Sequence, residues 1–252
     1  MTIEIRRESD IFRTDGGWFE ARWHFSFSQY HDPARMGVGP LRVFNDDRLV
    51  PGGVWPMHPH RDVESLTYVV EGSFGHADSL GNGGNLQPGA AQVMTFGPRG
   101  AQHSERNDDP DRPMRFLQFW ILPDRDGLPD AVQQHQFSEQ ERTDRWLTIM
   151  SPAGEPGLDL HQDARVRVSR VTAGSTLEHA VAAGRGGYLY VIDGEVTLHA
   201  SPGEDVLQAG DAVVLEGAET LRLTGVADAT ELWVADVPLA FEPKGIWASL
   251  PR

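Results

Sequence analysis

Two stretches of the chain repeat at nearly the same interval, and this internal duplication constrains the fold most. The segment TYVVEG, which ends at Gly72, resembles YLYVIDG, which ends 122 residues later at Gly194. The segment LQPGAAQVM around Gly89 resembles LQAGDAVVL around Gly210, 121 residues later. Short apolar runs separated by glycine turns are typical of β-barrels and sandwiches. The sequence therefore predicts an all-β chain with two similar barrels in tandem.

Composition supports a turn-rich β protein and excludes several classes of function. The 252 residues include 27 Gly and 17 Pro, and the absence of Cys excludes disulfides and thiolate metal sites. A net charge of −15 argues against direct binding of nucleic acid, because phosphate backbones are repelled. The N-terminal residues do not resemble a signal peptide, and no apolar run is long enough to span a membrane. We expect a cytoplasmic, monomeric protein without a membrane or nucleic-acid partner.

The duplication also sets the expected domain limits. We predict a first barrel over residues 1–123, a connector over 124–146, a second barrel over 147–237 and a tail over 238–252. The connector is polar and acidic, and a short helix is expected from Leu128 to Gln134, with Pro129 near its start. The tail is expected to pack on a barrel because it carries four apolar side chains, Phe241, Ile246, Trp247 and Leu250.

Two pairs of side chains at i, i+2 spacing predict a metal site. His58 and His60 form the first pair, and His103 and Glu105 form the second, which begins 45 residues after His58. On a β-strand both members of such a pair point to one face. Imidazole and carboxylate donors without thiolate suit a divalent transition metal. The second copy has Ala180, Ala182, Thr224 and Val226 at the matching positions. One metal per chain, in the first barrel, is therefore predicted.

The surrounding residues carry a family resemblance. Gly52, His58, His60 and Glu64 match the spacing of the first cupin signature, and Pro98, Gly100, His103 and Asn107 match the second. From about Trp18 to Pro123 the chain further resembles the pirin family, in RVFNDD (42–47), HPHRDVE (58–64), HADSLG (76–81) and QHSE (102–105). This resemblance implies a bicupin, two cupin-type β-barrels (double-stranded β-helices) in tandem, with a metal in the N-terminal barrel alone.

The fourth ligand has two candidates. Strand alternation allows both Glu64 and Glu105 to face the histidines. Cupins in general use the position of Glu64, whereas resemblance to pirins favours Glu105. We therefore predict His58, His60, His103 and Glu105 as ligands, and Glu64 as a buried acid that orients a histidine. We expect structural hydrogen bonds from His24 and His76, and no role in the site for His135, His161, His179 and His199.

The resemblance also implies an activity. Some pirins are quercetin 2,3-dioxygenases, so a flavonol-like aromatic substrate and O₂ are expected, with Glu105 accepting the proton of the flavonol 3-hydroxyl. Four ligands on an octahedral ion leave two positions for substrate, water or O₂. Fe²⁺ is the expected metal, with manganese, nickel, cobalt, copper and zinc left open. The apolar candidates for the substrate pocket are Trp55, Met57, Met94, Phe96, Phe116 and Trp120, of which Trp55 and Met57 flank the ligand strand.

Two alternative functions belong to other classes. The first is a non-enzymatic, iron-binding redox sensor that acts on a protein partner, since pirins are also known as transcriptional cofactors. The second is another cupin chemistry, sugar-phosphate isomerisation, which needs a cluster of basic groups for the phosphate. Lys244 is the only lysine in the chain and there is no basic patch, which argues against isomerisation.

Overall fold

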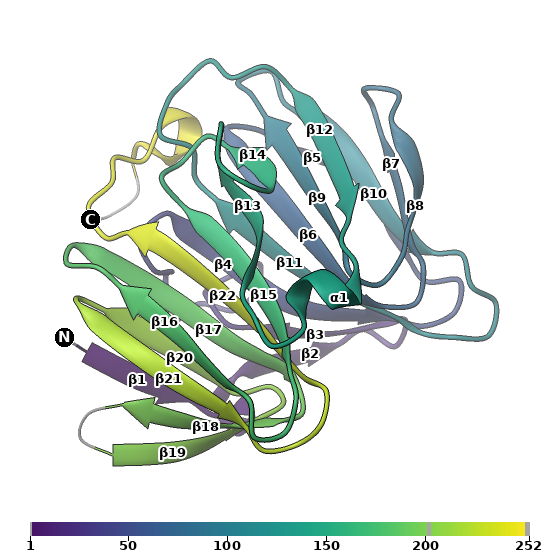
Figure 1. Ribbon diagram of the computed structural model, residues 1–252. Coiled ribbons are helices and arrows are strands. Elements are labelled where there is room, and N and C mark those ends of the chain that lie inside the picture. Colours follow the sequence, from purple (N-terminus) through teal and green to yellow (C-terminus); the bar gives the residue numbers. More distant parts are fainter. Residues whose placement is uncertain (1, 201–202, 250–252) are drawn as a thin grey trace. The chain divides into compact units, whose positions relative to one another are not determined.

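The computed structural model describes residues 2–200 and 203–249, and the predicted all-β class is confirmed (Figure 1). The chain forms two compact units, each assembled from separate segments. The N-terminal unit comprises Phe12–Phe137, Leu158–Gln162 and Glu242–Arg252, and the C-terminal unit comprises Met1–Ile11, Ser138–Gly157 and Asp163–Phe241. Sequence analysis placed the first eleven residues with the first barrel, and the structure places them in the C-terminal unit. Leu250, part of the expected tail, lies outside the described residues.

Two sheets build the N-terminal unit. Their strands are β2 (Phe12–Asp15), β3 (Phe19–Trp23), β4 (Leu41–Leu49), β5 (Val54–His60), β6 (Val63–Glu71), β7 (Phe74–Asp78), β8 (Gly83–Leu86), β9 (Ala90–Phe96), β10 (Ala101–Asn107), β11 (Met114–Ile121) and β12 (Ala131–Gln136). The short strand β14 (Leu158–Leu160) also lies in this unit but belongs to neither of these two sheets. One sheet has the order β12-β9-β6-β11-β4-β3-β2, and the other has the order β5-β10-β7-β8 (Figure 1). The 3-10 turn η2 (Gly245–Trp247) also belongs to this unit.

The C-terminal unit repeats this arrangement. Its elements are β1 (Thr2–Arg6), η1 (Glu8–Asp10), α1 (Glu139–Arg142), β13 (Leu147–Pro152), β15 (Arg165–Val171), β16 (Thr176–Val181), β17 (Arg185–Asp193), β18 (Glu195–Ala200), β19 (Gly203–Gln208), β20 (Ala212–Glu216), β21 (Glu219–Gly225) and β22 (Thr230–Pro238). The order β20-β17-β22-β15 repeats β9-β6-β11-β4, and β16-β21-β18-β19 repeats β5-β10-β7-β8. Gly72 and Gly194 occupy equivalent turns, with φ of +77° and +82° that favour glycine. The predicted duplication is therefore confirmed.

Aliphatic side chains fill the interior of the C-terminal unit. Leu177 and Val181 on β16 and Leu221 and Leu223 on β21 are buried in one cluster. These strands correspond to β5 and β10, which carry the two histidine pairs in the N-terminal unit. His179, also on β16, is buried, and desolvation lowers its pKa to about 4. Aliphatic side chains, with the single imidazole of His179 on the same face of β16, thus occupy the part of this unit that corresponds to the predicted metal site.

The expected helix from Leu128 to Gln134 is wrong. Residues Ala131–Gln136 form β12, which pairs antiparallel with β9, and Gln134 Nε2 donates to Gln92 Oε1 at 2.6 Å. The edge of β9 offers backbone partners over six residues, and this pairing outweighs the local helical preference. The helix of the connector comes later, at α1, where Ser138 caps it in a reciprocal capping box with Glu141.

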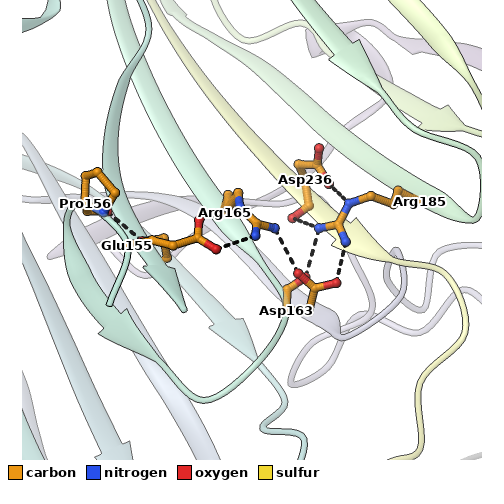
Figure 2. A network of polar contacts seen from close by, with 7 residues as sticks. Glu155, Pro156, Asp163, Arg165, Arg185 and Asp236 are labelled. Atoms are coloured by element: carbon orange, nitrogen blue, oxygen red, sulfur yellow. Dashed lines mark hydrogen bonds and ion pairs between the residues drawn. The ribbon is translucent and has the colours of Figure 1, made fainter. Parts of the chain in front are cut away.

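A chain of ion pairs connects several strands of the C-terminal unit (Figure 2). Arg165 Nη2 lies 2.6 Å from Glu155 Oε1, and Arg165 Nη1 lies 2.9 Å from Asp163 Oδ1. Arg185 Nη1 lies 2.6 Å from Asp163 Oδ2, and the same guanidinium donates to Asp236. Each of these charges has a partner of the opposite sign, which assigns this cluster a structural role.

Among residues 2–200 and 203–249, no helix combines the length and the apolar character needed to cross a membrane.

Candidate metal centre

Three histidines meet between β5 and β10. The strands pair antiparallel with His103 directly opposite His58, and His60 follows on the same strand as His58. One ring nitrogen from each of these three side chains lies within 4.8 Å of the other two. No other group of three or more potential metal ligands occurs in the part of the chain that the structure describes. The structure therefore brings together all three histidines that strand alternation singled out.

Glu105 lies beside this histidine triad. Alternate residues of β10, from Ala101 to Asn107, are buried, which places Glu105 on the same face as His103. Glu105 Oε1 lies 3.2 Å from His103 Nδ1, and the carboxyl group is 3% exposed. Glu105 as the fourth metal ligand stays a prediction that this position supports.

The polar atoms of the site fit a bound cation. Both ring nitrogens of His103 and Oε2 of Glu105 are buried without a hydrogen-bond partner among the described residues. Such atoms are costly unless something else pairs with them. His58 uses Nδ1 for the carbonyl of Pro56 at 2.8 Å, so its Nε2 stays free for a ligand role. The donor set of imidazoles and a carboxylate is one that divalent transition metals accept.

Burial keeps the imidazoles of His60 and His103 neutral. Desolvation, with a smaller contribution from His58, lowers the pKa of His60 to about 4. Desolvation and then the neighbouring histidines lower the pKa of His103 to about 2. A neutral imidazole has the lone pair that a metal needs, so these ligands require no deprotonation at neutral pH.

The second carboxylate candidate, Glu64, is occupied elsewhere. It is fully buried and accepts hydrogen bonds from Thr95 Oγ1 at 3.1 Å, from the backbone N–H of His161 at 3.0 Å, and pairs with His161 Nδ1 at 2.9 Å. The expectation that His161 belongs to the other half of the chain is wrong, because Leu158–Gln162 is part of the N-terminal unit. Glu64 is a structural acid, and the histidine that it orients is His161.

We expect the replacement Glu64→Gln to lower the free energy of unfolding by about 2 kcal/mol at pH 6, because it removes the charge partner of His161 from a buried pair. The hydrogen bond to Glu64 raises the pKa of His161. The stabilisation is therefore complete below the ordinary pKa of a histidine and is lost as the pH rises through the raised value, so the difference should shrink at pH 9.

Denaturant unfolding of wild type and variant at both pH values measures this difference. Glu204→Gln is the matched control, since it breaks a His–Glu pair whose carboxylate is 68% exposed and should cost under about 0.5 kcal/mol. A Glu64→Gln effect no larger than that of the control would contradict the structural role.

Two other histidines of the N-terminal unit are buried, and one of them, His76, has its ring centroid 6.0 Å from that of His103. His76 is buried, but its ring nitrogens make no hydrogen bond within the described residues, and the nearest charged group is Asp78, at 3.9 Å from Nε2. The expected structural hydrogen bond of His76 is therefore absent there. His24 is buried and packs its ring edge-on against Phe44, with 4.9 Å between ring centroids. Neither belongs to the histidine triad.

A cavity of about 550 Å³ opens at the triad, and His58, His60 and Glu105 are in its wall. A volume of this size suits a drug-sized aromatic ligand. Four of the six predicted pocket residues line it, Trp55, Met57, Phe116 and Trp120. Met94 and Phe96 do not line it and are buried in the core instead. Trp18 and Phe19 add two aromatic rings, each with its centroid less than 5 Å from that of Trp55.

Two polar residues of the cavity were missed from the sequence. Asn45 and Asp47 on β4 line it and are almost fully buried. Desolvation, followed by the charges of Asp46 and Glu105, raises the pKa of Asp47 well above its usual range. Their motif, RVFNDD, served only to identify the family resemblance. Alternation along a strand of unknown orientation does not show which of its acids faces a cavity.

Comparison with known families decides the identity of the fold. The family model described as Pirin matches residues 5–121, and the model described as Quercetinase C-terminal cupin domain matches residues 148–237. The chain belongs to the pirin family. The predicted bicupin architecture is thereby confirmed, with the pirin model over the histidine triad and the second cupin model over the strands with the aliphatic interior.

Relatives of this pirin carry names that concern flavonols and metals. A Pseudomonas aeruginosa protein named "putative quercetin 2,3-dioxygenase" is 38% identical over 234 residues, which cover 92% of this chain and 98% of that protein. The quercetin 2,3-dioxygenase of Escherichia coli K12 is 34% identical over 198 residues, 78% of this chain and 84% of that protein. The crystal structure of the Escherichia coli pirin YhhW in complex with nickel(II) has a TM-score of 0.86 and 30% identity, and covers 95% of this chain and 100% of that one.

Proposed function

We propose that this pirin is a metal-dependent dioxygenase that opens a flavonol such as quercetin with O₂, and that its metal is iron. The observation that carries the proposal is the cavity in which His58, His60 and Glu105 meet a wall of aromatic side chains, with His103 completing the histidine triad beside it. A flavonol has a flat ring system that fits the aromatic wall and a pair of oxygens that can bind a metal held by the histidines. Relatives with at least 34% identity carry the name of the same activity.

The aromatic wall would bind and orient the substrate. Trp18, Phe19 and Trp55 form a cluster with ring centroids 4.6–4.8 Å apart. Packing a flavonol against these rings excludes water from the reacting face and buries apolar area on both partners. The substrate is thereby held with its 3-hydroxyl and 4-carbonyl toward the histidines.

His58, His60, His103 and Glu105 would hold the metal. A bound divalent ion supplies Lewis acidity toward the 3-hydroxyl and a redox-active partner for O₂. The imidazoles of His60 and His103, which burial keeps neutral, supply ligands without adding negative charge. This leaves Glu105 as the one acidic group of the four.

Glu105 would receive the proton of the 3-hydroxyl. Burial raises the pKa of Glu105 to about 8, close to the range in which a general base works best at neutral pH. A carboxylate that is bound to a cation is a weaker base. The proton transfer is therefore most effective when the Glu105 carboxylate leaves the ligand set as substrate arrives. Both atoms of O₂ then enter the products, a phenolic carboxylic ester and carbon monoxide.

The proposal predicts that iron-loaded protein bleaches the long-wavelength absorption band of quercetin in air and releases one carbon monoxide for each flavonol consumed. Treatment with a chelator should lower this rate at least about 100-fold, and added Fe²⁺ should restore it. Equal rates for loaded protein, chelated protein and buffer would refute the enzymatic function. Stable iron binding without turnover would then favour the redox sensor.

A further inference from the structure

β4 presents alternate side chains to opposite faces near the cavity. Asn45 and Asp47 line the cavity, whereas Asp46 between them does not. Asp46 is paired with the guanidinium of Arg115, with Oδ2 2.7 Å from Nη2. The carboxylate on the far face of β4 therefore has a partner of opposite charge within the fold.

The cavity face of β4 carries two oxygen atoms without partners. Oδ1 of Asn45 and Oδ1 of Asp47 are buried and accept no hydrogen bond from the described residues, and the two side chains are 2% and 5% exposed. An oxygen that is buried without a donor loses its hydration and gains no hydrogen bond in return, which is unfavourable for folding. Buried polar groups in folded proteins are rarely left without a partner, so two on one face of one strand indicate that a ligand or water supplies the donors.

Gln118, a neighbouring polar residue of the cavity wall, has hydrogen-bond partners for both of its side-chain polar atoms. Gln118 on β11 lies opposite Asn45 in the strand register and also lines the cavity. Its Oε1 accepts from Thr67 Oγ1 at 3.1 Å, and its Nε2 donates to Ser65 Oγ at 2.5 Å. The fold therefore satisfies Gln118, whereas Asn45 and Asp47 line the cavity with a side-chain oxygen that has no hydrogen-bond partner among the described residues.

We propose that Asn45 and Asp47 form a hydroxyl-binding subsite that selects polyhydroxylated flavonols. This inference rests on the proposed function and names the substrate class more narrowly. A phenolic hydroxyl is the donor that fits, because it is carried on the flat ring that the aromatic wall binds. It can both donate and accept, so it pairs with the carboxyl group of Asp47 in either protonation state. Flavonols that have only the 3-hydroxyl and the 4-carbonyl would leave both oxygens unpaired.

Binding to the iron-loaded protein without O₂ tests the subsite apart from turnover. The probes are quercetin and 3-hydroxyflavone, which share the metal-binding oxygen pair and differ in the ring hydroxyls. Quenching of tryptophan fluorescence reports binding, since Trp18, Trp55 and Trp120 line the cavity. We expect wild type to bind quercetin roughly 10- to 100-fold more tightly, since a site built for a hydroxyl rejects the analogue that lacks it.

Replacing the two polar residues singly should remove this preference. Asp47→Leu and Asn45→Leu should each lower the ratio of the two affinities at least about fivefold, while the affinity for 3-hydroxyflavone changes less than about twofold. Asp47→Asn keeps an oxygen acceptor and should keep most of the ratio. Asp111→Asn removes an exposed acid as a matched control and should keep all of it.

The outcomes separate this inference from the proposed function. A wild-type ratio near one, or an unchanged ratio in both leucine variants, overturns the subsite even if quercetin is turned over. A ratio that collapses in the leucine variants supports the subsite even if no carbon monoxide is released, in which case the dioxygenase proposal fails alone. If Asp47→Leu does not fold, the ratio in Asn45→Leu decides.

Discussion

His103→Ala is expected to reduce bound iron from about one equivalent per chain to below about one tenth after dialysis, and to abolish flavonol turnover. His103 is 1% exposed and lies opposite His58 in the strand pair, and one of its ring nitrogens is among the three that meet in the triad. Loss of an outer hydrogen-bond partner of a ligand already costs about 10- to 100-fold in affinity, and loss of a ligand itself costs more. Elemental analysis together with the rate of carbon monoxide release measures both effects.

A matched control distinguishes the effect of removing a metal ligand from the effect of removing any histidine side chain. His135→Ala removes an exposed histidine from β12 and should leave metal content and turnover within about twofold of wild type. Thermal unfolding without metal shows whether His103→Ala folds. Retention of a full equivalent of iron by a folded His103→Ala protein would show that the metal binds elsewhere.

Glu105→Gln is expected to lower kcat by roughly 10²- to 10⁴-fold, the contribution of a positioned general base. The three histidines and an amide oxygen at position 105 remain as donors, so at least half of the metal content should be kept. In wild type, kcat/KM should rise with pH as Glu105 loses its proton, and this acid limb should be missing in the variant. The limb should lie below pH 8, because a nearby cation lowers the pKa from the value of about 8 that burial alone produces.

The stability of the metal-free proteins provides the control for Glu105→Gln. A carboxyl whose folded pKa is raised destabilises the native state as the pH rises from its ordinary value toward about 8. The variant has no such group, so it should unfold at a higher denaturant concentration than wild type at pH 9. A variant that is more stable at pH 9 and nevertheless turns over quercetin at the wild-type rate would exclude Glu105 as the base.

Strand alternation predicts part of the site correctly. It places His58 and His60 on one face of β5 and His103 and Glu105 on one face of β10, because a regular strand has a side-chain period of two. It does not reveal that His103 pairs with His58 while Glu105 pairs with Trp55. This β-bulge in β5 brings Trp55 to the cavity at an odd distance from His58, and bulges have no clear sequence signal.

The other features that the sequence does not predict depend on contacts between residues that are far apart in the chain. The role of Glu64 depends on His161, 97 residues away, and nothing near either residue in the sequence predicts their contact. Asn45 and Asp47 become a candidate subsite only because the fold places them in the cavity wall with no partner for their Oδ1 atoms among the described residues. The helix expected from Leu128 to Gln134 is wrong for the same reason, since pairing with the edge of β9 makes Ala131–Gln136 a strand.

Anomalous diffraction at the iron edge, from crystals of the iron-loaded protein, tests the central claim most directly. We expect one peak per chain, within bonding distance of ring nitrogens of His58, His60 and His103 and of a carboxylate oxygen of Glu105. A peak in the C-terminal unit, or one in the N-terminal unit that is not bound by the three histidines, would contradict the account.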